Sequence, residues 1–335
     1  MSKMLNSGPG GFQHGLTLVE LMVSLVLGLT LSSGIISVYL ESKRNFAAEE
    51  ELARIQENGR FAISLLKREI MQAGFTGGYL SFTGMNKISI SKDCDTNWAL
   101  DLDTPVDFIN NFSSTRVALS GDDLNCLDED EVQPGTDVLS IKRTAGEPTA
   151  YAGVLLTGAT AKKNQIYLRV KNYGDEKTWY RHTSTNPLPG LGPKSSIEYW
   201  EMYSRLYYIR RFSSQPGDGV PTLCVRELVD NAMTERCYVE GVENMQIVFG
   251  IDDDFSADGV PDQYLMDPDD LNAVVTVSVF LLMRSLMELA GTAVNSVKSF
   301  KLGADPNTID TDDRYLRRIF STTVQMRNAI VANHG

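Results

Sequence analysis

One carboxylate, that of Glu20, lies inside an apolar segment that is long enough to cross a membrane. The segment extends from Leu16 to Leu40 and contains no other charged residue. With about 1.5 Å of rise per residue, a helix of this length spans a hydrocarbon core of about 30 Å. An acid within such a helix costs on the order of 2.5–3.5 kcal/mol, and less near the interface. Glu20 therefore either lies at the membrane edge or pairs with a positive charge from outside the segment.

A free α-amino group would provide that positive charge if the chain were cut immediately before Leu16. The amine of the same chain, or that of a neighbouring copy, could then pair with Glu20. Residues 1–15 contain one lysine, Lys3, and lack the apolar stretch of an ordinary secretory signal. A pairing role for Glu20 therefore requires that the N-terminus be processed.

A second candidate for chemistry is the acidic segment DDDFSADGVPDQYLMD at 252–267. Residues with side-chain oxygens stand at every second position before Gly259 and again three residues after it. This spacing is that of a calcium-binding loop with oxygen ligands. The candidate ligands are Asp254, Ser256, Asp258, Asp262 and the carbonyl group of Val260. Leu265 stands where an EF-hand has a bidentate glutamate, and no flanking helices are evident. The alternatives are a calcium site and a solvated acidic turn, and the abundance of turn-forming residues favours the turn.

Patterns typical of enzymes do not occur in the sequence. The three histidines, His14, His182 and His334, are far apart, and His182 is expected to be a surface residue in a loop. No GxSxG motif, P-loop, HExxH motif or dinucleotide fingerprint is present. The sequence therefore predicts a protein that is not an enzyme and requires no cofactor, apart from the candidate calcium ion.

The four cysteines are Cys94, Cys126, Cys224 and Cys237, and they allow three pairings. Their spacing does not match a zinc site. In a reducing compartment they would be buried thiols, whereas outside the cytoplasm disulfides are favoured. In that case Cys94–Cys126 and Cys224–Cys237 are the favoured pairs, because each closes a short local loop.

The charge of the chain restricts its partners. The formal net charge is −12 over 335 residues. Such an acidic balance argues against a nucleic acid as partner, because the phosphate backbone is also negative. It equally argues against docking of the polar part on anionic lipid.

The residues after the apolar segment predict a long helix followed by strands. Apolar residues recur at three- and four-residue steps from Leu52 to Ala73, which extends the helix to about residue 75. The remainder contains seven segments with strand character. They are 137–144, 165–170, 204–212, 222–229, 245–252, 272–285 and 314–328. In 204–212 and the aromatic residues around it, core residues are expected on one side and surface tyrosines on the other.

The N-terminal residues GFQHG followed by LTLVELMVSLVLGL resemble a type IV prepilin leader and its membrane helix. The resemblance implies that prepilin peptidase cuts between Gly15 and Leu16 and that Leu16 becomes N-methylated. Glu20 then takes the position of the family's assembly glutamate, which pairs with the N-terminal amine of an adjacent subunit. Leu16 departs from the phenylalanine usual at this position.

Several stretches further along resemble the PilW family of minor pilins. They are 57–78, 239–254, 272–285 and the ending RRIFSTTVQMRN. The resemblance implies an α+β, pilin-like fold, with a long N-terminal helix packed on an antiparallel β-rich head. The expected parts are a leader (1–15), a transmembrane half (16–40) and an amphipathic half (41–75) of the helix, and the globular head (76–335).

This resemblance also implies a function and a location. We expect a minor pilin that takes part in initiating type IV pilus assembly, in a complex at the pilus tip. Its partners would be prepilin peptidase, other minor pilins, the major pilin, a tip adhesin and, before assembly, inner-membrane lipid with the head in the periplasm. The alternatives are a J-type minor pseudopilin of type II secretion and a membrane-anchored binding protein or hydrolase.

Overall fold

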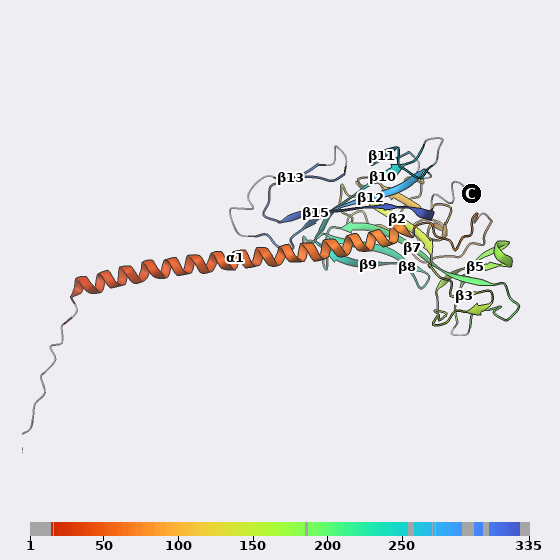
Figure 1. Cartoon of the computed structure of the whole chain (residues 1–335), viewed down its shortest axis with the longest axis horizontal. Coiled ribbons are helices and arrows are strands. Elements are labelled where there is room, and N and C mark those ends of the chain that lie inside the picture. Colours follow the sequence, from red (N-terminus) through yellow and green to blue (C-terminus); the bar gives the residue numbers. More distant parts are fainter. Residues whose placement is uncertain are drawn as a thin grey trace, which may run out of the picture. The chain divides into compact units, whose positions relative to one another are not determined.

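The computed structural model describes residues 15, 17–82, 84–184, 187–253, 258–269, 271, 273–289, 298–303 and 308–328. The chain divides into two compact units, one ending at Glu50 and the other beginning at Glu51. A single helix, α1 (Leu18–Met71), contributes to both units, and antiparallel strands dominate the second (Figure 1). The predicted α+β, pilin-like fold with a long N-terminal helix and a β-rich head is confirmed.

The part of α1 that belongs to the second unit buries one face. Ile55, Ala62, Leu66 and Ile70 are all at most 2% exposed. Their steps of seven and four residues keep them on one side of a helix with 3.6 residues per turn. The helix is followed by Gly74, whose φ of 70° is the left-handed conformation common after helix C-termini.

The larger sheet of the second unit contains nine strands. They are β1 (Val106–Ile109), β2 (Val138–Thr144), β3 (Ala150–Tyr151), β4 (Val154–Leu155), β5 (Ile166–Lys171), β6 (Glu176–Arg181), β7 (Glu198–Arg210), β8 (Thr222–Val229) and β9 (Ala232–Glu240). The long strand β7 is the hub, because it pairs antiparallel with β2, β3, β5 and β8. The predicted strand 222–229 coincides with β8.

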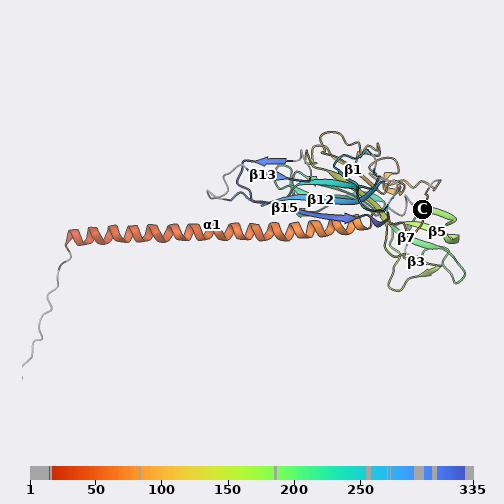
Figure 2. The ribbon, with the colours of Figure 1, turned by 45° about the horizontal axis from the view of Figure 1, so that its top comes forward.

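The smaller sheet has the order β11-β10-β12-β15. Its strands are β10 (Val242–Ile251), β11 (Gln263–Leu265), β12 (Val274–Arg284) and β15 (Arg317–Gln325). The apolar segment 272–285 therefore contains an interior strand, as its alternation of valines predicts. Figure 2 shows β12 and β15 side by side, and a separate hairpin is formed by β13 (Lys298–Lys301) and β14 (Thr308–Thr311).

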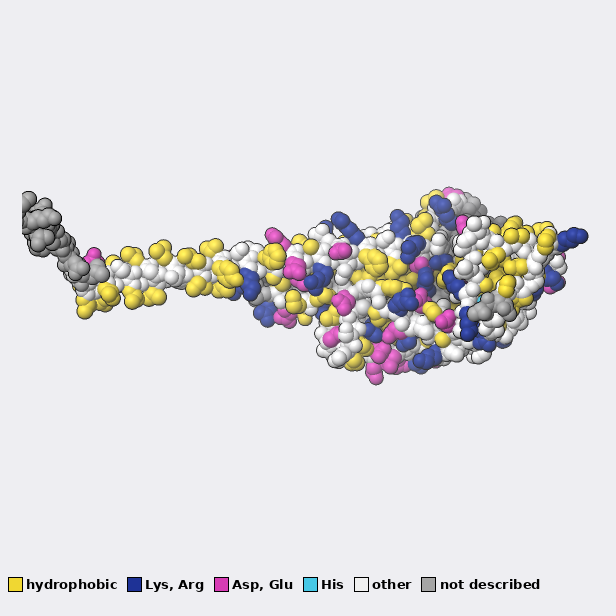
Figure 3. Space-filling view, turned by 90° about the horizontal axis from the view of Figure 1, so that it is seen from below, with side chains coloured by type: hydrophobic (Ala, Val, Ile, Leu, Met, Phe, Trp, Pro, Cys, Tyr) yellow, Lys and Arg dark blue, Asp and Glu magenta, His cyan; other side chains and the backbone are white. Residues whose placement is uncertain are grey.

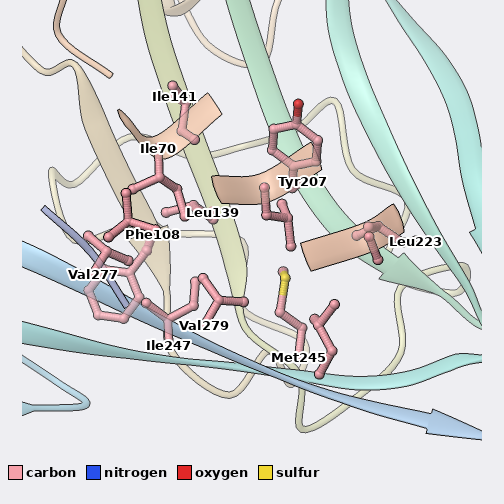
Figure 4. Close-up of a cluster of buried hydrophobic side chains, with 14 of the residues drawn as sticks. Ile70, Phe108, Leu139, Ile141, Tyr207, Leu223, Met245, Ile247, Val277 and Val279 are labelled. Atoms are coloured by element: carbon pink, nitrogen blue, oxygen red, sulfur yellow. The ribbon is translucent and has the colours of Figure 1, made fainter. Parts of the chain in front are cut away.

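One hydrophobic core lies between the two sheets and α1. Figure 4 shows Ile70 of α1 near Leu139 of β2 and Phe108 of β1, with Ile247 of β10 below them. The rings of Phe108 and Phe249 lie 4.7 Å apart, so β1 and β10 are in direct contact. Burial of this helix face against both sheets fixes the position of the C-terminal part of α1 within the head.

A second core covers the opposite face of β7. Met202, Leu206 and Tyr208 on that face pack with Trp98 and other residues of the segment between α1 and β2. Both faces of β7 are therefore buried, and Tyr207 and Tyr208 are each 1% exposed. The expectation of surface tyrosines on one side of this strand is wrong, because the loop segment forms a second layer over it.

Candidate functional site

The N-terminal motif begins α1 with a capped turn. Gly15 is exposed, and Leu16 lies outside the described residues. The hydroxyl of Thr17 accepts a hydrogen bond from the N–H of Glu20 at 3.3 Å, and its carbonyl accepts one from Leu21 at 3.2 Å. Thr17 is thus an N-cap with a glutamate three residues later, the Thr-x-x-Glu pattern of a capping box. The carboxylate also lies in the first turn, where the helix dipole favours negative charge.

The side chain of Glu20 has no cationic neighbour on its own helix. The first Lys or Arg that follows it is Lys43, about 35 Å further along the axis at 1.5 Å per residue. Glu20 is exposed in the isolated chain. A partner for this carboxylate inside a membrane or a helix bundle must therefore come from the chain terminus or from another molecule.

The residues that follow Glu20 present apolar side chains on all sides of the helix. This part of α1 is long and apolar enough to cross a membrane. None of the residues in its most apolar stretch is buried against the described part of the chain. Leu18, Leu31, Ile35 and Val38 are each at least 68% exposed. Figure 3 shows hydrophobic side chains gathered along this part of the helix, with charged groups following it. A helix that is apolar all round needs lipid or other helices to cover it.

Three hydroxyl groups within this apolar stretch are satisfied by the helix itself. Ser24 donates to the carbonyl of Glu20 at 2.8 Å, and Ser37 donates to the carbonyl of Ser33 at 2.9 Å. Thr30 makes the same kind of bond to the turn before it. Such bonds remove the need for water, so these polar residues are compatible with a lipid or helix environment.

Two buried glutamates attach the second part of α1 to the head. Glu69 is 2% exposed and lies 3.2 Å from the guanidinium of Arg143, and it also pairs with Arg205. Glu51 is equally buried and accepts a hydrogen bond from the backbone N–H of Leu286 at 2.9 Å. The sequence analysis did not predict that these two glutamates are buried. Their positions in register with the apolar stripe of the helix are a signal that could have indicated it.

Two disulfides stabilise the head. Cys94 is joined to Cys126 and Cys224 to Cys237, which are the pairs that short loops favour. The second bond links directly opposed residues of β8 and β9. The first closes a loop in the segment that covers β7, where few regular strands are present to hold the chain.

The acidic segment forms turns in its described part. Asp254 and Ser256 lie outside the described residues. Asp258 accepts a hydrogen bond from the N–H of Val260 at 2.9 Å, and the carboxylate of Asp262 accepts one from the N–H of Asp253 at 3.1 Å. Within the described ranges, no group of three or more His, Cys, Asp or Glu residues could hold a metal ion.

His182 is buried rather than on the surface. It is 1% exposed and packs near the ring of Tyr180, with 6.2 Å between the ring centroids. The prediction of a surface histidine is wrong, because the residue directly follows β6 and its ring is buried beside that of Tyr180. His14 and His334 lie outside the described residues, so no histidine pair is formed in the described head.

Comparison with known proteins finds two family matches, one in the head and one at the N-terminus. Residues 206–328 match the family of type IV pilus-assembly protein W, and residues 12–36 match the prokaryotic N-terminal methylation motif. No curated protein and no solved structure matches the chain. The first match includes β8 to β15, and the second includes the capped turn at Glu20. The resemblance to PilW-type pilins is confirmed, and the two matches indicate a type IV pilus-related pilin.

Proposed function

From these two matches we propose that the protein is a minor pilin that takes part in initiating type IV pilus assembly, in a complex at the pilus tip. The observation that carries the proposal is the combination of a methylation motif with an apolar helix that the described residues leave exposed. A helix of this kind is held in the inner membrane before assembly and among other pilin helices afterwards. The head, in the periplasm before assembly, then provides the surface that other pilins or a tip adhesin contact.

The N-terminal residues have distinct roles in this proposal. Prepilin peptidase cuts between Gly15 and Leu16, and the new amine of Leu16 is methylated. Glu20 pairs with the amine of an adjacent subunit, and the pairing aligns the two helices along their axes. The pairing is favoured at low dielectric, where two charges a few Å apart attract far more strongly than in water.

The mature N-terminus of membrane-extracted protein is the first measurement to make. Mass spectrometry should find a terminal peptide that begins at N-methylated Leu16. Replacement of Gly15 by alanine should leave partial processing, whereas replacement by tryptophan should block it. A retained leader, or normal cleavage of the Gly15→Trp protein, would rule out the prepilin pathway as proposed.

Co-purified partners separate pilus assembly from type II secretion. Crosslinked full-length protein should retain other minor pilins and the major pilin of the pilus system. Recovery of secretion pseudopilins alone would contradict the tip-complex proposal, although the processing at Gly15 would be the same.

The calcium site in 252–267 stays a prediction. Calorimetric titration of the full-length protein with calcium chloride, repeated with Asp258→Asn/Asp262→Asn, tests it directly. Heat that disappears in the variant would support binding by this loop. No heat in the unaltered protein would leave the segment as an acidic turn.

A further inference from the structure

A groove lies at the end of the head where α1 finishes and β1 begins. Its walls come from five separate parts of the chain. They are residues within 74–82, residues 102–107, residues 119–120, Asp269 with Leu271 before β12, and Met326 with Asn328 after β15. The volume is about 690 Å³, within the range of about 300–1,000 Å³ that ligand-binding sites occupy. None of the interactions proposed above uses this groove.

The charges of the groove all have one sign. Asp103, Asp107 and Asp269 line it, and none of its described lining residues is Lys, Arg or His. Asp107 is fully buried and accepts hydrogen bonds from the hydroxyl and the N–H of Ser120. Burial raises the pKa of Asp107 above its ordinary value despite these bonds. The two exposed carboxylates, Asp103 and Asp269, form no ion pair within the described chain.

Apolar side chains and bare backbone complete the walls. Phe82, Leu102 and Leu271 line the interior, and Leu80 at the mouth is 49% exposed. Gly78 adopts a φ of 86°, and a Cβ placed there would meet nothing within 4 Å. A glycine of this kind leaves space for another backbone to approach closely. The wall of the groove therefore combines apolar side chains, carboxylates and a glycine whose backbone another chain can approach.

From this combination we propose that the groove binds an extended peptide segment of a partner protein that carries Lys or Arg between apolar side chains. The carboxylates of Asp103 and Asp269 attract the cation, and the leucine and phenylalanine side chains cover its apolar neighbours. The partner's main chain passes over Gly78. The proposal is independent of the pilus assignment, because the groove belongs to the head and excludes the N-terminal motif.

Peptide binding to the full-length protein in lipid nanodiscs tests the proposal. The probe is a fluorescein-labelled pool of pentapeptides with Arg or Lys at the centre and Leu, Val, Ile or Phe at the other positions. A matched pool has Glu or Gln at the centre. Fluorescence anisotropy should show at least about tenfold tighter binding of the cationic pool. Equal binding of both pools, or binding of neither, would overturn the proposal.

Two pairs of variants locate the binding. Asp103→Asn/Asp269→Asn should weaken the cationic pool about tenfold, whereas the exposed control Glu147→Gln/Asp175→Asn should leave it unchanged. Gly78→Asn adds a side chain at a lining position in a conformation that asparagine tolerates, so it should weaken binding about tenfold by obstructing the partner's main chain. Gly158→Asn is the control, since Gly158 has a φ of 81° and equally open surroundings. Loss in a control, or retention in both groove variants, would place the peptide elsewhere.

A simple amine competitor separates a peptide site from a general cation site. An excess of n-hexylamine should displace the peptides weakly, because it reproduces one apolar arm and the charge alone. Displacement at the same concentration as an unlabelled pentapeptide would contradict recognition of an extended chain. Glu20→Ala should not alter any of these measurements, so failure of the groove proposal and failure of the assembly proposal remain distinguishable.

Discussion

The two parts of α1 differ in where their apolar side chains lie, which are exposed in the first part and buried in the second. From Leu18 to Glu50, leucine and valine side chains are exposed, and no described residue covers them. From Glu51 to Met71, a stripe of apolar residues is buried together with two glutamates. The second part is completed by the protein's own head, whereas the first part requires an external environment. One continuous helix thus has one part that packs inside the head and one whose apolar side chains stay exposed. In the proposed function, lipid and other pilins cover the exposed part.

The test in the first part of the helix is at Glu20, whose proposed partner lies on another molecule. Glu20→Ala should leave cleavage and membrane insertion intact but reduce recovery in sheared pili about tenfold or more, equivalent to about 1.4 kcal/mol. Immunoblots of the pilus and membrane fractions measure the ratio. Glu41→Ala, beyond the apolar segment, is the control. Normal recovery of the Glu20→Ala protein would show that this carboxylate pairs with nothing during assembly.

Glu69 provides the corresponding test in the second part of the helix. Glu69→Ala should lower the free energy of unfolding by about 3–5 kcal/mol, because Arg143 and Arg205 lose a buried partner. Glu57→Ala, on the exposed face, should change it by less than about 0.5 kcal/mol. Denaturant unfolding of the full-length protein in nanodiscs measures both. Equal stability of the two variants would mean that the buried pair does not hold the helix to the head.

A compensating change sharpens this test. In Glu69→Met/Arg143→Met, the pair with Arg143 becomes an apolar contact, and Arg205 keeps its second partner, Glu227, at 3.5 Å. Part of the stability lost in Glu69→Ala should therefore return. If the double variant is as unstable as Glu69→Ala, the loss does not come from the unpaired charge of Arg143.

Sequence patterns predict the first part of α1 well and the second part incompletely. The exposed apolar run follows from composition and can be predicted directly, whereas the roles of Gly15 and Glu20 stay predictions. The helix and the seven main strands of the head also follow from periodicity. The partners of Glu51 and Glu69 cannot be read in this way, because Leu286, Arg143 and Arg205 are remote in sequence and meet only in the folded head.

Prediction from the sequence misses β9, a strand of nine residues, as well as several shorter strands and tertiary features. Short strands such as β3 and β4, with two residues each, have too few positions to show alternation. The second layer over β7 is built largely from irregular segments, so nothing in the local sequence indicates that Tyr208 and His182 are buried. The groove beside Asp107 is likewise assembled from distant segments. These features depend on tertiary contacts and not on local propensity.

A smaller effect is expected from matched glycine changes in the two parts of the helix. A Cβ at Gly59 would lie 2.5 Å from the ring of Phe320 in β15, whereas a Cβ at Gly28 would meet nothing within 4 Å. Gly59→Ala should destabilise the head, because overpacking costs about 1–3 kcal/mol and the gain in helix propensity is about 1 kcal/mol. Gly28→Ala should leave the head's unfolding unchanged. The same denaturant curves measure both, and destabilisation by Gly28→Ala would show that its surroundings are not open within the chain.

The smallest expected effect concerns the start of the helix. Thr17→Ala removes the hydroxyl that accepts the N–H of Glu20, which should cost about 1 kcal/mol of local stability. Hydrogen exchange in nanodiscs should then be about fivefold faster at the amides of Glu20 and Leu21, while amides near Glu69 keep their rates. Thr30→Ala is the control, because its hydroxyl bonds to a carbonyl inside the helix and caps nothing. If Thr17→Ala leaves these amides protected, the first turn is held by the environment of Glu20, and the glutamate orders the terminus without the cap.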